Sequence, residues 1–402
     1  MSQKPSDRLA IEGGAPVRRE VLIFGSPDVR EAELREVEAT LRSGWIGTGP
    51  RVARLEEAFR RYIGARYAMA LNSCTAGLHL SMIAVGVRPG DEVITTPMTF
   101  ASTGNAIVHL GATPVFVDCQ RETLCIDPQR IAARVNEQTR AIVPVHFAGR
   151  AADMTRIQEI ARAHSVRIVE DAAHAIETVH QGRKIGVIGD CTAFSFYVTK
   201  NVITGEGGMV TTEDPEIADW IKIAGLHGMS RDAWKRYSDE GFRHYEVTFP
   251  GFKYNMMDLQ AAIGLPQLER VEANLARREQ IWRRYTEAFA DLPLRIPQDP
   301  PPGDRHARHL FVILCELEQL RYDRDWILQA LHAEGIGTGV HYRPLHLHPY
   351  YRKQFGYREG DFPDAEWIGA RTISLPLSSK LSDDDVGDVI AAVHKVLNAA
   401  QR

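Results

Sequence analysis

The sequence predicts an α/β fold, with a mostly parallel sheet sandwiched by helices and a smaller C-terminal α+β domain. Short apolar runs alternate with helix-patterned stretches between about residues 65 and 225, as they do when each strand is followed by a crossover helix. A long helical pattern then replaces the alternation. The chain has 402 residues, which is more than one hydrophobic core usually holds, so two domains are expected.

The strands of the predicted sheet are short and apolar. They are Ala68–Leu71, Asp91–Thr96, Pro114–Asp118, Ala141–Val145, Val166–Glu170, Thr192–Phe196 and Met209–Thr212. Apolar residues at helical spacing predict helices at Ala76–Val87, Ser102–Leu110, Pro128–Glu137 and Met154–His164. Because a helix lies between most pairs of strands, the strands are expected to run parallel, with helices on both faces of the sheet.

The C-terminal part begins with a helical pattern over Asp258–Phe289, which Pro266 interrupts early. A Pro-rich stretch at 293–303 then leads to strands, helices and a final helical pattern over Asp383–Asn398. We therefore predict a large domain at residues 1–257. Residues 258–402 would form a linking helix and the smaller domain.

Composition and charge exclude several classes of protein. The 48 basic and 52 acidic residues give a net charge of −4, which offers no electrostatic attraction to nucleic acid or to an anionic membrane. The five cysteines are scattered and form no Cys-x-x-Cys pair, so neither a disulfide framework nor a zinc site is expected. The first residues lack an apolar signal core, and no uncharged run approaches about 18 residues. We expect a cytoplasmic protein.

Lys200 has the sequence setting of a residue that carries covalent chemistry. It follows the predicted strand 192–196 and precedes a Gly-rich run, so it should lie at the end of the sheet. A carbonyl cofactor that binds lysine as a Schiff base also needs a carboxylate to keep its ring nitrogen protonated, and Asp171 follows an upstream strand. Ser73 and Thr75 open a helix, where phosphate binds well. Together these parts predict a site for pyridoxal 5'-phosphate (PLP).

Each part has a simpler explanation when it is taken alone. A lysine after a strand is usually a solvated charge. Asp171, or the Ser73 and Thr75 pair, could be helix caps. The order of the three parts along the chain favours the cofactor site, because each lies at the carboxyl end of a predicted strand, where open α/β sheets bind ligands.

An ordered series of motifs runs along nearly the whole chain. It comprises Ser43–Gly49, Thr95–Phe100, Pro144–Gly149, Glu170–His174, Ser195–Lys200, Gly205–Gly208, Gly251–Met256 and His341–Leu347. In these motifs the chain resembles the DegT/DnrJ/EryC1/StrS family of sugar aminotransferases, which are fold type I PLP enzymes. A single Gly-x-Gly-Gly would mean little, whereas many motifs in order make a chance match very improbable.

The resemblance implies the activity and the residues that carry it. The enzyme would move an amino group from L-glutamate or L-glutamine to a keto sugar linked to UDP, dTDP or GDP, in a ping-pong cycle. Lys200 would be the Schiff-base lysine and catalytic base, Asp171 the partner of the ring nitrogen, and His174 a neighbour of the ring hydroxyl. The phosphate would be held by Ser73, Cys74, Thr75 and Ser195.

Phe100 would stack on the pyridine face, although an aromatic residue after a strand is as often part of a core. His174 could instead be a solvent-facing residue of a helix. Three further residues match positions near the substrate in the family: Trp45, His341 and Tyr342. Three arginines are available for a diphosphate or a donor carboxylate: Arg231, Arg243 and Arg343.

The segment Gly251–Asn255 resembles one that reaches across a dimer interface to the cofactor phosphate of the other subunit. The chain would then be a homodimer with shared active sites. Many members of the family carry Asn-Tyr-Arg where this chain has Lys-Tyr-Asn, so either Lys253 or Asn255 could be the phosphate ligand.

Three alternative functions compete with this prediction. The family's sugar dehydratases resemble this chain with histidine in place of the lysine, whereas Lys200 is present. An aminocyclitol aminotransferase would share every motif, and a PLP-binding regulatory protein without turnover would keep the lysine. No basic arm or DNA-binding module supports the regulatory reading. His346 and His348 have no third ligand at a suitable spacing, so no metal site is expected.

Overall fold

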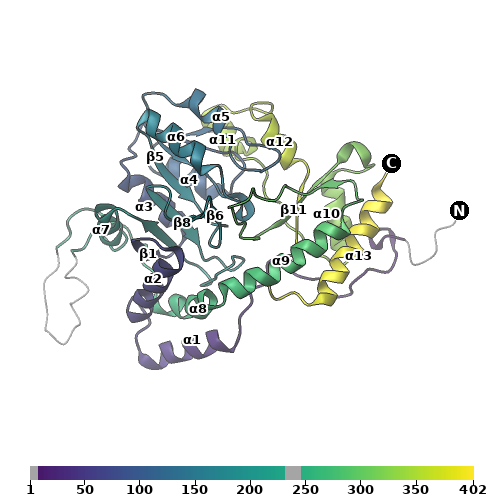
Figure 1. Ribbon diagram of the computed structural model, residues 1–402, viewed down its shortest axis with the longest axis horizontal. Coiled ribbons are helices and arrows are strands. Elements are labelled where there is room, and N and C mark those ends of the chain that lie inside the picture. Colours follow the sequence, from purple (N-terminus) through teal and green to yellow (C-terminus); the bar gives the residue numbers. More distant parts are fainter. Residues whose placement is uncertain (1–7, 231–245) are drawn as a thin grey trace.

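The computed structural model describes residues 8–230 and 246–402. Within these residues, a seven-stranded sheet has the order β1-β9-β8-β5-β4-β2-β3 (Figure 1). Strand β9 is antiparallel to β1 and β8, and the other neighbouring strands are parallel to each other. The strands are β1 (Tyr67–Leu71), β2 (Glu92–Thr95), β3 (Thr113–Phe116), β4 (Thr139–Val143), β5 (Arg167–Asp171), β8 (Cys191–Ser195) and β9 (Gly208–Thr212). The predicted mostly parallel sheet is confirmed.

Helices cover both faces of this sheet. One face packs against α3 (Cys74–Ala84), α4 (Ala101–His109) and α7 (Pro215–Ala224). The other packs against α2 (Pro50–Ile63), α5 (Pro128–Ile131), α6 (Met154–His164) and α8 (Asp258–Glu269). Along β4, Ala141 and Val143 face the helices of the first group and Ile142 faces those of the second group. Burial on both faces explains why the strands read as nearly continuous apolar runs.

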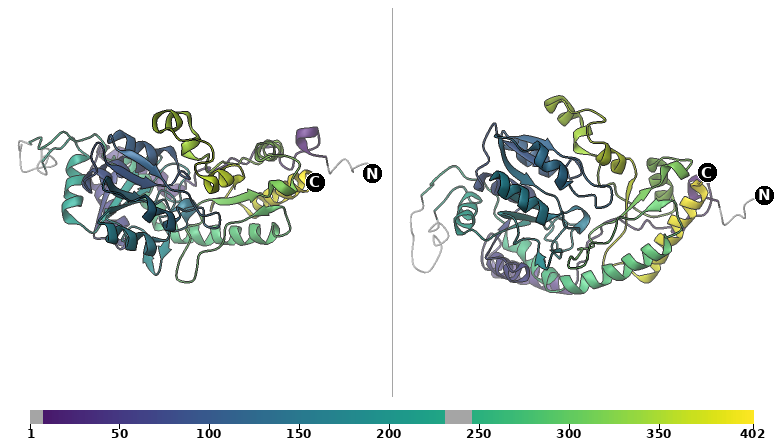
Figure 2. Two further views of the ribbon diagram at one scale, coloured as in Figure 1. Left: turned by 90° about the horizontal axis from the view of Figure 1, so that it is seen from above. Right: turned by 45° about the horizontal axis from the view of Figure 1, so that its top comes forward.

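A second, smaller sheet lies at the far end of α9 (Val271–Ala288), the long green helix that rises diagonally towards the right in Figure 1. Its three strands are antiparallel in the order β10 (Leu294–Arg295), β11 (Phe311–Cys315) and β12 (Thr372–Leu375). Helices α10 (Arg324–Ala333) and α13 (Asp383–Ala400) pack on it, and Figure 2 shows this unit extending away from the large sheet.

The two cores exchange segments of the chain. Leu9, near the N-terminus, is buried in the core of the smaller sheet, whereas Leu345 and Tyr351 are buried in that of the large sheet. The division at residues 257 and 258 therefore stays a prediction.

The long C-terminal helical pattern breaks at Arg270 and not at Pro266. Pro266 lies inside α8, and Arg270, between α8 and α9, has φ −104° and ψ 9°. The Arg270 guanidinium donates a hydrogen bond of 3.2 Å to the carbonyl of Pro266. That carbonyl would otherwise lack a partner at the end of the helix, so the side chain stabilises the break one turn after the proline.

The predicted helix over Pro128–Glu137 is shorter than expected. Helix α5 continues only as a single 3-10 turn, η2 (Ala132–Arg134). Next, the backbone N–H of Asn136 donates to the hydroxyl of Thr139 over 3.0 Å. Side-chain oxygens of this kind compete with the helical hydrogen-bond pattern, which explains the early end.

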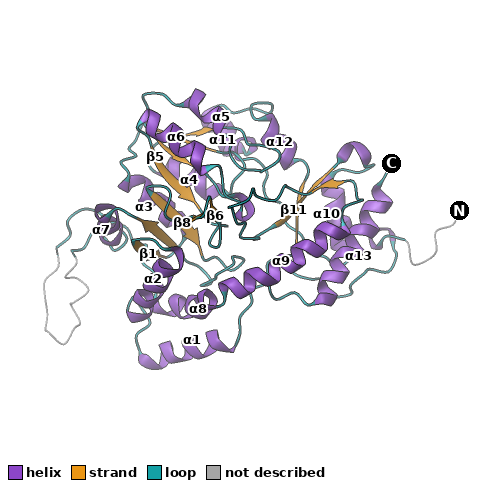
Figure 3. Cartoon of the chain, in the orientation of Figure 1, coloured by secondary structure: helices purple, strands orange, loops and turns teal. Residues whose placement is uncertain are grey.

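The remaining elements are short or lie at the periphery (Figure 3). They are η1 (Ala10–Glu12), α1 (Glu31–Ser43), η3 (Phe147–Gly149), β6 (Val179–His180), β7 (Arg183–Lys184), η5 (Leu317–Gln319), η6 (Leu345–Leu347), α11 (Pro349–Phe355) and α12 (Pro363–Gly369). In the described part of the chain, no helix has both the length and the apolar character to cross a membrane.

Candidate active site

A cavity of about 550 Å³ opens at the carboxyl ends of β5 and β8. Strand β1 ends at the same edge and leads into α3. The cavity brings together ten of the residues that the sequence singled out: Ser73, Cys74, Thr75, Phe100, Asp171, His174, Ser195, Lys200, His341 and Tyr342. Because these side chains come from separate parts of the sequence, the parallel arrangement of the strands is what gathers them.

Lys200 supplies the amine of this cavity. Its backbone N–H donates to the carbonyl of Tyr197 over 2.8 Å, which fixes the turn after β8. Burial lowers the pKa of Lys200 to about 8, while the neighbouring Cys74 and Asp171 act in the opposite direction. Within residues 8–230 and 246–402, the amine has no hydrogen-bond partner. A lysine of this kind has a substantial neutral fraction near pH 8 and can act as a nucleophile.

Asp171 is a buried carboxylate at the end of β5. One oxygen accepts a hydrogen bond of 2.7 Å from the hydroxyl of Thr103, which is itself bonded to Thr99 over 2.7 Å. The other accepts a 3.1 Å bond from the backbone N–H of Ala173. Burial raises the pKa of Asp171, and the bonds from Thr103 and Ala173 oppose this shift. The residues directly after Asp171 do not form a helix, so Asp171 is not a helix cap.

Sequence reasoning missed Thr99 and Thr103. Thr99 lies two residues before α4, and Thr103 lies in the first turn of that helix. Two threonines at this spacing, next to a predicted strand end, were the available signal.

His174 is buried and lies outside any helix, so the solvent-facing alternative is wrong. Its Nδ1 accepts a hydrogen bond of 3.2 Å from the backbone N–H of Ala148. A neutral ring must then carry its proton on Nε2, 3.2 Å from the hydroxyl of Tyr342. Burial lowers the pKa of His174 well below its usual range, and the charge of Lys200 adds to this effect. Tyr342 therefore accepts from His174 and keeps its own proton to donate.

The start of α3 forms the polar end of the cavity. The Ser73 hydroxyl accepts a hydrogen bond of 3.1 Å from the backbone N–H of Ala76, so Ser73 does cap the helix. The backbone N–H groups of Cys74 and Thr75 lie at the same helix start, where an anion is stabilised. A Cβ atom on Gly208 would lie 2.5 Å from the carbonyl carbon of Ser73. Glycine therefore allows β9 to pass this close to the helix start.

Phe100 and His341 lie on the walls of the cavity. Phe100 is 62 % exposed, so it is not a core residue; its ring centre is 6.3 Å from that of Tyr342. The Nδ1 atom of His341 lies 2.8 Å from the hydroxyl of Ser374, and burial lowers the pKa of His341 to about 4. Both rings are available to contact a molecule in the cavity.

Comparison with known proteins agrees with this geometry. A family model described as the DegT/DnrJ/EryC1/StrS aminotransferase family matches residues 27–394. The chain belongs to this family. It is a PLP-dependent aminotransferase, and the sequence-based identification is confirmed.

Two relatives align with nearly the whole chain. The uncharacterized protein MJ1066 of Methanocaldococcus jannaschii is 52% identical over 372 residues, or 92% of this chain and 96% of the relative. The spore coat polysaccharide biosynthesis protein SpsC of Bacillus subtilis is 50% identical over 384 residues, or 95% of this chain and 99% of the relative.

Among solved structures, Spr1654 of Streptococcus pneumoniae, which has been assigned as a sugar aminotransferase, is 35% identical to this chain. Its pyridoxamine phosphate form superposes with a TM-score of 0.88, covering 94% of this chain and 99% of Spr1654. Its PLP form gives a TM-score of 0.87. Family membership and fold therefore agree, and the cofactor is PLP.

The residues of the cavity fit this cofactor of the family. The amine of Lys200 has no partner among the described residues, and Asp171 presents a buried carboxylate in the same cavity. The start of α3, with the backbone N–H groups of Cys74 and Thr75, suits a phosphate. The free amine, the buried acid and the anion site are the three features that PLP requires.

Three predicted residues do not line this cavity. Trp45 and Asn255 line a second cavity of about 510 Å³. The Lys253 amine donates to the side-chain oxygen of Asn255 over 2.6 Å, and the Asn255 amide donates to the hydroxyl of Thr48. The backbone of this segment nevertheless lies beside the start of α3, because Asn72 N–H donates to the carbonyl of Tyr254 over 2.6 Å.

The predicted arginines lie outside the cavity or outside the described residues. Arg343 is exposed and donates to the carbonyl of Leu347 over 3.3 Å. Arg231 and Arg243 fall outside the residues that the structure describes. His346 pairs with Glu366 over 2.8 Å, and in the described ranges no three ligating side chains converge as a metal would need.

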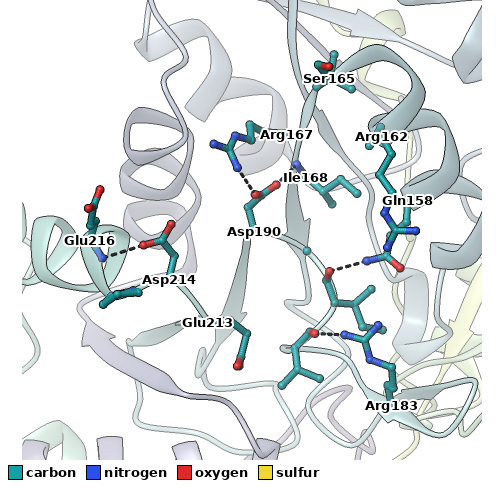
Figure 4. A pocket seen from close by; sticks show the side chains of 16 residues that line it. Gln158, Arg162, Ser165, Arg167, Ile168, Arg183, Asp190, Glu213, Asp214 and Glu216 are labelled. Carbon is teal, nitrogen blue, oxygen red and sulfur yellow. Dashed lines mark hydrogen bonds and ion pairs between the residues drawn. The ribbon is translucent and has the colours of Figure 1, made fainter.

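A larger hollow, of about 1110 Å³, lies at the opposite edge of the sheet, where β5 and β8 begin (Figure 4). Figure 4 shows Arg167 directed at Asp190, and these two form an ion pair of 2.7 Å. Asp214 caps α7 by accepting from the backbone N–H of Glu216 over 2.8 Å. These charged groups are partnered within the fold. We call this hollow the lower groove.

Proposed function

We propose that the enzyme transfers an amino group from L-glutamate or L-glutamine to a keto sugar carried on a nucleoside diphosphate. The observation that carries this proposal is the juxtaposition of Lys200 and Asp171 in one cavity at the carboxyl edge of the sheet. The relationship to SpsC, a spore coat polysaccharide biosynthesis protein, supports a sugar as the acceptor.

In this proposal the residues of the cavity have different roles. PLP supplies the carbonyl that receives the amino group and a ring that withdraws electrons. Asp171 would keep the ring nitrogen protonated. Its burial and its hydrogen bond from Thr103 hold the carboxylate in place for this role. Lys200 would bind the cofactor covalently and, when free, move a proton at the reacting carbon. The start of α3 and Ser195 would hold the phosphate.

The neutral state of the surrounding histidines suits this chemistry. Burial lowers the pKa of both His174 and His341. Among the described side chains that line the cavity, Lys200 is therefore the cation near neutral pH while its amine is free. His174 would contact the ring hydroxyl. The hydroxyl of Tyr342 would donate a hydrogen bond to an oxygen of the cofactor or substrate. Phe100 would cover the ring face, with His341 nearer to the sugar.

A panel of UDP-, dTDP- and GDP-linked keto sugars tests the substrate class. Each is incubated with the PLP-loaded enzyme and L-glutamate, and the product is followed by the mass change of amination. Formation of an amino sugar by the wild type and not by Lys200→Ala supports the proposal. Amination of a keto cyclitol, with every nucleotide sugar left unchanged, would replace the sugar by the aminocyclitol class.

The donor half-reaction separates an enzyme from a PLP-binding regulator. L-Glutamate or L-glutamine is added to the PLP-loaded protein in the absence of a sugar, and the cofactor absorbance and the keto acid are measured. The proposed function requires conversion to the pyridoxamine phosphate spectrum. A spectrum that neither donor changes would contradict it.

We further propose a homodimer in which Lys253 and Asn255 complete the cavity of the other subunit. Their absence from the Lys200 cavity of their own chain supports this arrangement, as does the exposed position of Lys253. Lys200→Ala disables its own site, whereas Ala at both 253 and 255 would disable the partner's site. A heterodimer of the two variants then contains one intact site by two-fold symmetry.

Subunit exchange between the two inactive variants should therefore restore part of the activity. Mass spectrometry of the intact complex verifies that heterodimers have formed. If heterodimers form without any recovery, Lys253 and Asn255 serve their own chain.

A further inference from the structure

Behind the cavity wall, four polar side chains form a connected chain that the chemistry described above does not use. Arg278 of α9 forms an ion pair with Glu177, and both are buried. The amide of Asn201, the residue after Lys200, donates to Glu177 over 2.8 Å. His309 lies with its Nδ1 3.0 Å from the side-chain oxygen of Asn201. We call these four residues the buried relay.

The partners in the buried relay fix which atoms carry protons. The Asn201 amide nitrogen faces the Glu177 carboxylate and, over 3.1 Å, the carbonyl of Ala307, both of which can only accept. The Asn201 oxygen must therefore accept from His309, whose proton is held on Nδ1. Burial lowers the pKa of His309 well below its usual range, with Lys200 adding to the effect. His309 is thus a neutral ring in a fixed orientation.

The ring of His309 packs on the ring of His174. Their centres are 4.4 Å apart, and the ring planes are 33° from parallel. The backbone of Ala148 contacts both residues, because its N–H donates to His174 and its carbonyl accepts from the backbone of His309 over 3.1 Å. One face of His174 is therefore supported by a ring that is held by hydrogen bonds.

The buried relay connects the cavity to the hydrophobic core of the smaller sheet. Arg278 lies one helical turn before Trp282 on α9, and His309 lies two residues before β11. Trp282 and Phe311 of these elements pack together in the smaller core, with ring centres 4.6 Å apart. Asn201 and His174 belong to the large sheet's side of the molecule. The buried relay therefore joins the two units directly behind the cavity.

We propose that His309 is a positioning residue, which holds the ring of His174 in place at the cofactor cavity while Asn201, Glu177 and Arg278 hold His309. This inference rests on the proposed function, in which His174 contacts the cofactor. A stacked neighbour excludes alternative rotamers of His174, so its loss should loosen the bound cofactor more than it alters the remainder of the fold.

Two substitutions at position 309 separate the stack from the hydrogen bond. His309→Phe keeps a ring against His174 but cannot donate to Asn201. His309→Asn keeps a donor close to the Nδ1 position but removes the ring. His306→Phe is the matched control: His306 and His309 are both 6% exposed, and the His306 ring packs on Trp282 instead, 5.2 Å away.

PLP release from the holoenzyme and the induced circular dichroism of bound PLP are measured, together with the melting temperature. In His309→Asn we expect release at least about tenfold faster and a changed dichroic band, the scale on which lost outer support weakens a bound group. His309→Phe should stay within about threefold of the wild type in release, although its melting temperature falls because Asn201 loses a partner. His306→Phe should leave release and the dichroic band unchanged.

Equal release rates in His309→Asn and the wild type would overturn the positioning role. So would faster release in His306→Phe to the same extent, because a purely structural effect would explain both variants. Lys200→Ala is measured in parallel. If it retains the wild-type PLP spectrum, the proposed function fails; if it loses that spectrum while His309→Asn does not alter release, only the positioning role fails.

Discussion

The two edges of the large sheet differ in what they do with charge. The lower groove has about 1110 Å³, twice the 550 Å³ of the cavity. Its Arg167 is 56 % exposed and pairs with Asp190. In the cavity, by contrast, Lys200 has no partner among the described residues and Asp171 is buried. Size therefore does not identify the active site; an unpaired amine beside a buried acid does.

Strand direction explains this difference. In a parallel sheet the carboxyl ends of the strands lie at one edge, and the loops that follow them carry side chains into a common space. Asp171 and Ser195 end β5 and β8, whereas Arg167 and Cys191 begin them. Residues only a few positions apart are thus sorted into opposite edges with different roles.

The strongest test of the comparison is removal of the cavity amine. Lys200→Ala should lower the transamination rate by at least about 10⁴-fold, because the covalent link and the proton transfer are lost together. The protein should remain folded, as judged by its far-ultraviolet circular dichroism. Activity above a few per cent of the wild type would remove Lys200 from its assigned role.

The buried acid should have the next largest effect. Asp171→Asn keeps the size of the side chain but removes the charge that would hold the ring proton. We expect a rate loss of about 10²- to 10³-fold, on the scale of a lost electrostatic group in an active site. PLP affinity, measured by titrating the cofactor-free protein, should change far less. A loss of affinity as large as the loss of rate would show that Asp171 mainly anchors the cofactor.

The pH dependence of stability tests the burial of Lys200 in the cofactor-free protein. Its pKa falls from 10.5 to about 8 on folding, so the unfolded chain binds more protons between pH 8 and 10.5. The resulting destabilisation is complete below pH 8, and it disappears as the pH rises to 10.5. Relative to the wild type, Lys200→Met should therefore gain up to roughly 3 kcal/mol at pH 7, at about 1.4 kcal/mol per unit of pKa.

Urea unfolding of both cofactor-free proteins at pH 7 and pH 10 measures this gain. The difference between the variants should shrink markedly at pH 10. A difference that is the same at both values would mean that the folded-state pKa of Lys200 is not lowered.

A substitution in the lower groove should have the smallest effect on activity. Arg167→Ala removes an exposed ion pair, and such pairs contribute less than about 1 kcal/mol. Asp190 keeps its 2.8 Å hydrogen bond from the backbone of Ile168, so we expect a small loss of stability and activity within about twofold of the wild type. A large loss of activity would mean that the groove has a role in the reaction, which would contradict the assignment of function to the cavity alone.

Much of the fold was readable from the sequence because its signals are local. All seven strands of the large sheet were predicted with ends within two residues, and the helix Met154–His164 was predicted with its observed ends. Alternation of apolar runs and helical periodicity act over a few residues and report directly on burial. The break at Arg270 was missed, because it depends on a side chain reaching back to the carbonyl of Pro266.

The types of residue at and after the strand ends can be read from the sequence alone: the acid, the lysine and the capped helix start of the candidate site. The hydrogen-bond partners of those groups follow from the tertiary structure. Thr103 and Asp171 are 68 positions apart, and Tyr342 and His174 are 168 apart. Propensity and periodicity extend over a turn or a strand, whereas a hydrogen bond depends on the packing of whole elements. For that reason, the proton positions on His174 and His309 cannot be read from the sequence. The same holds for the hydrogen bonds by which Arg278 of α9 and Glu177 support these rings.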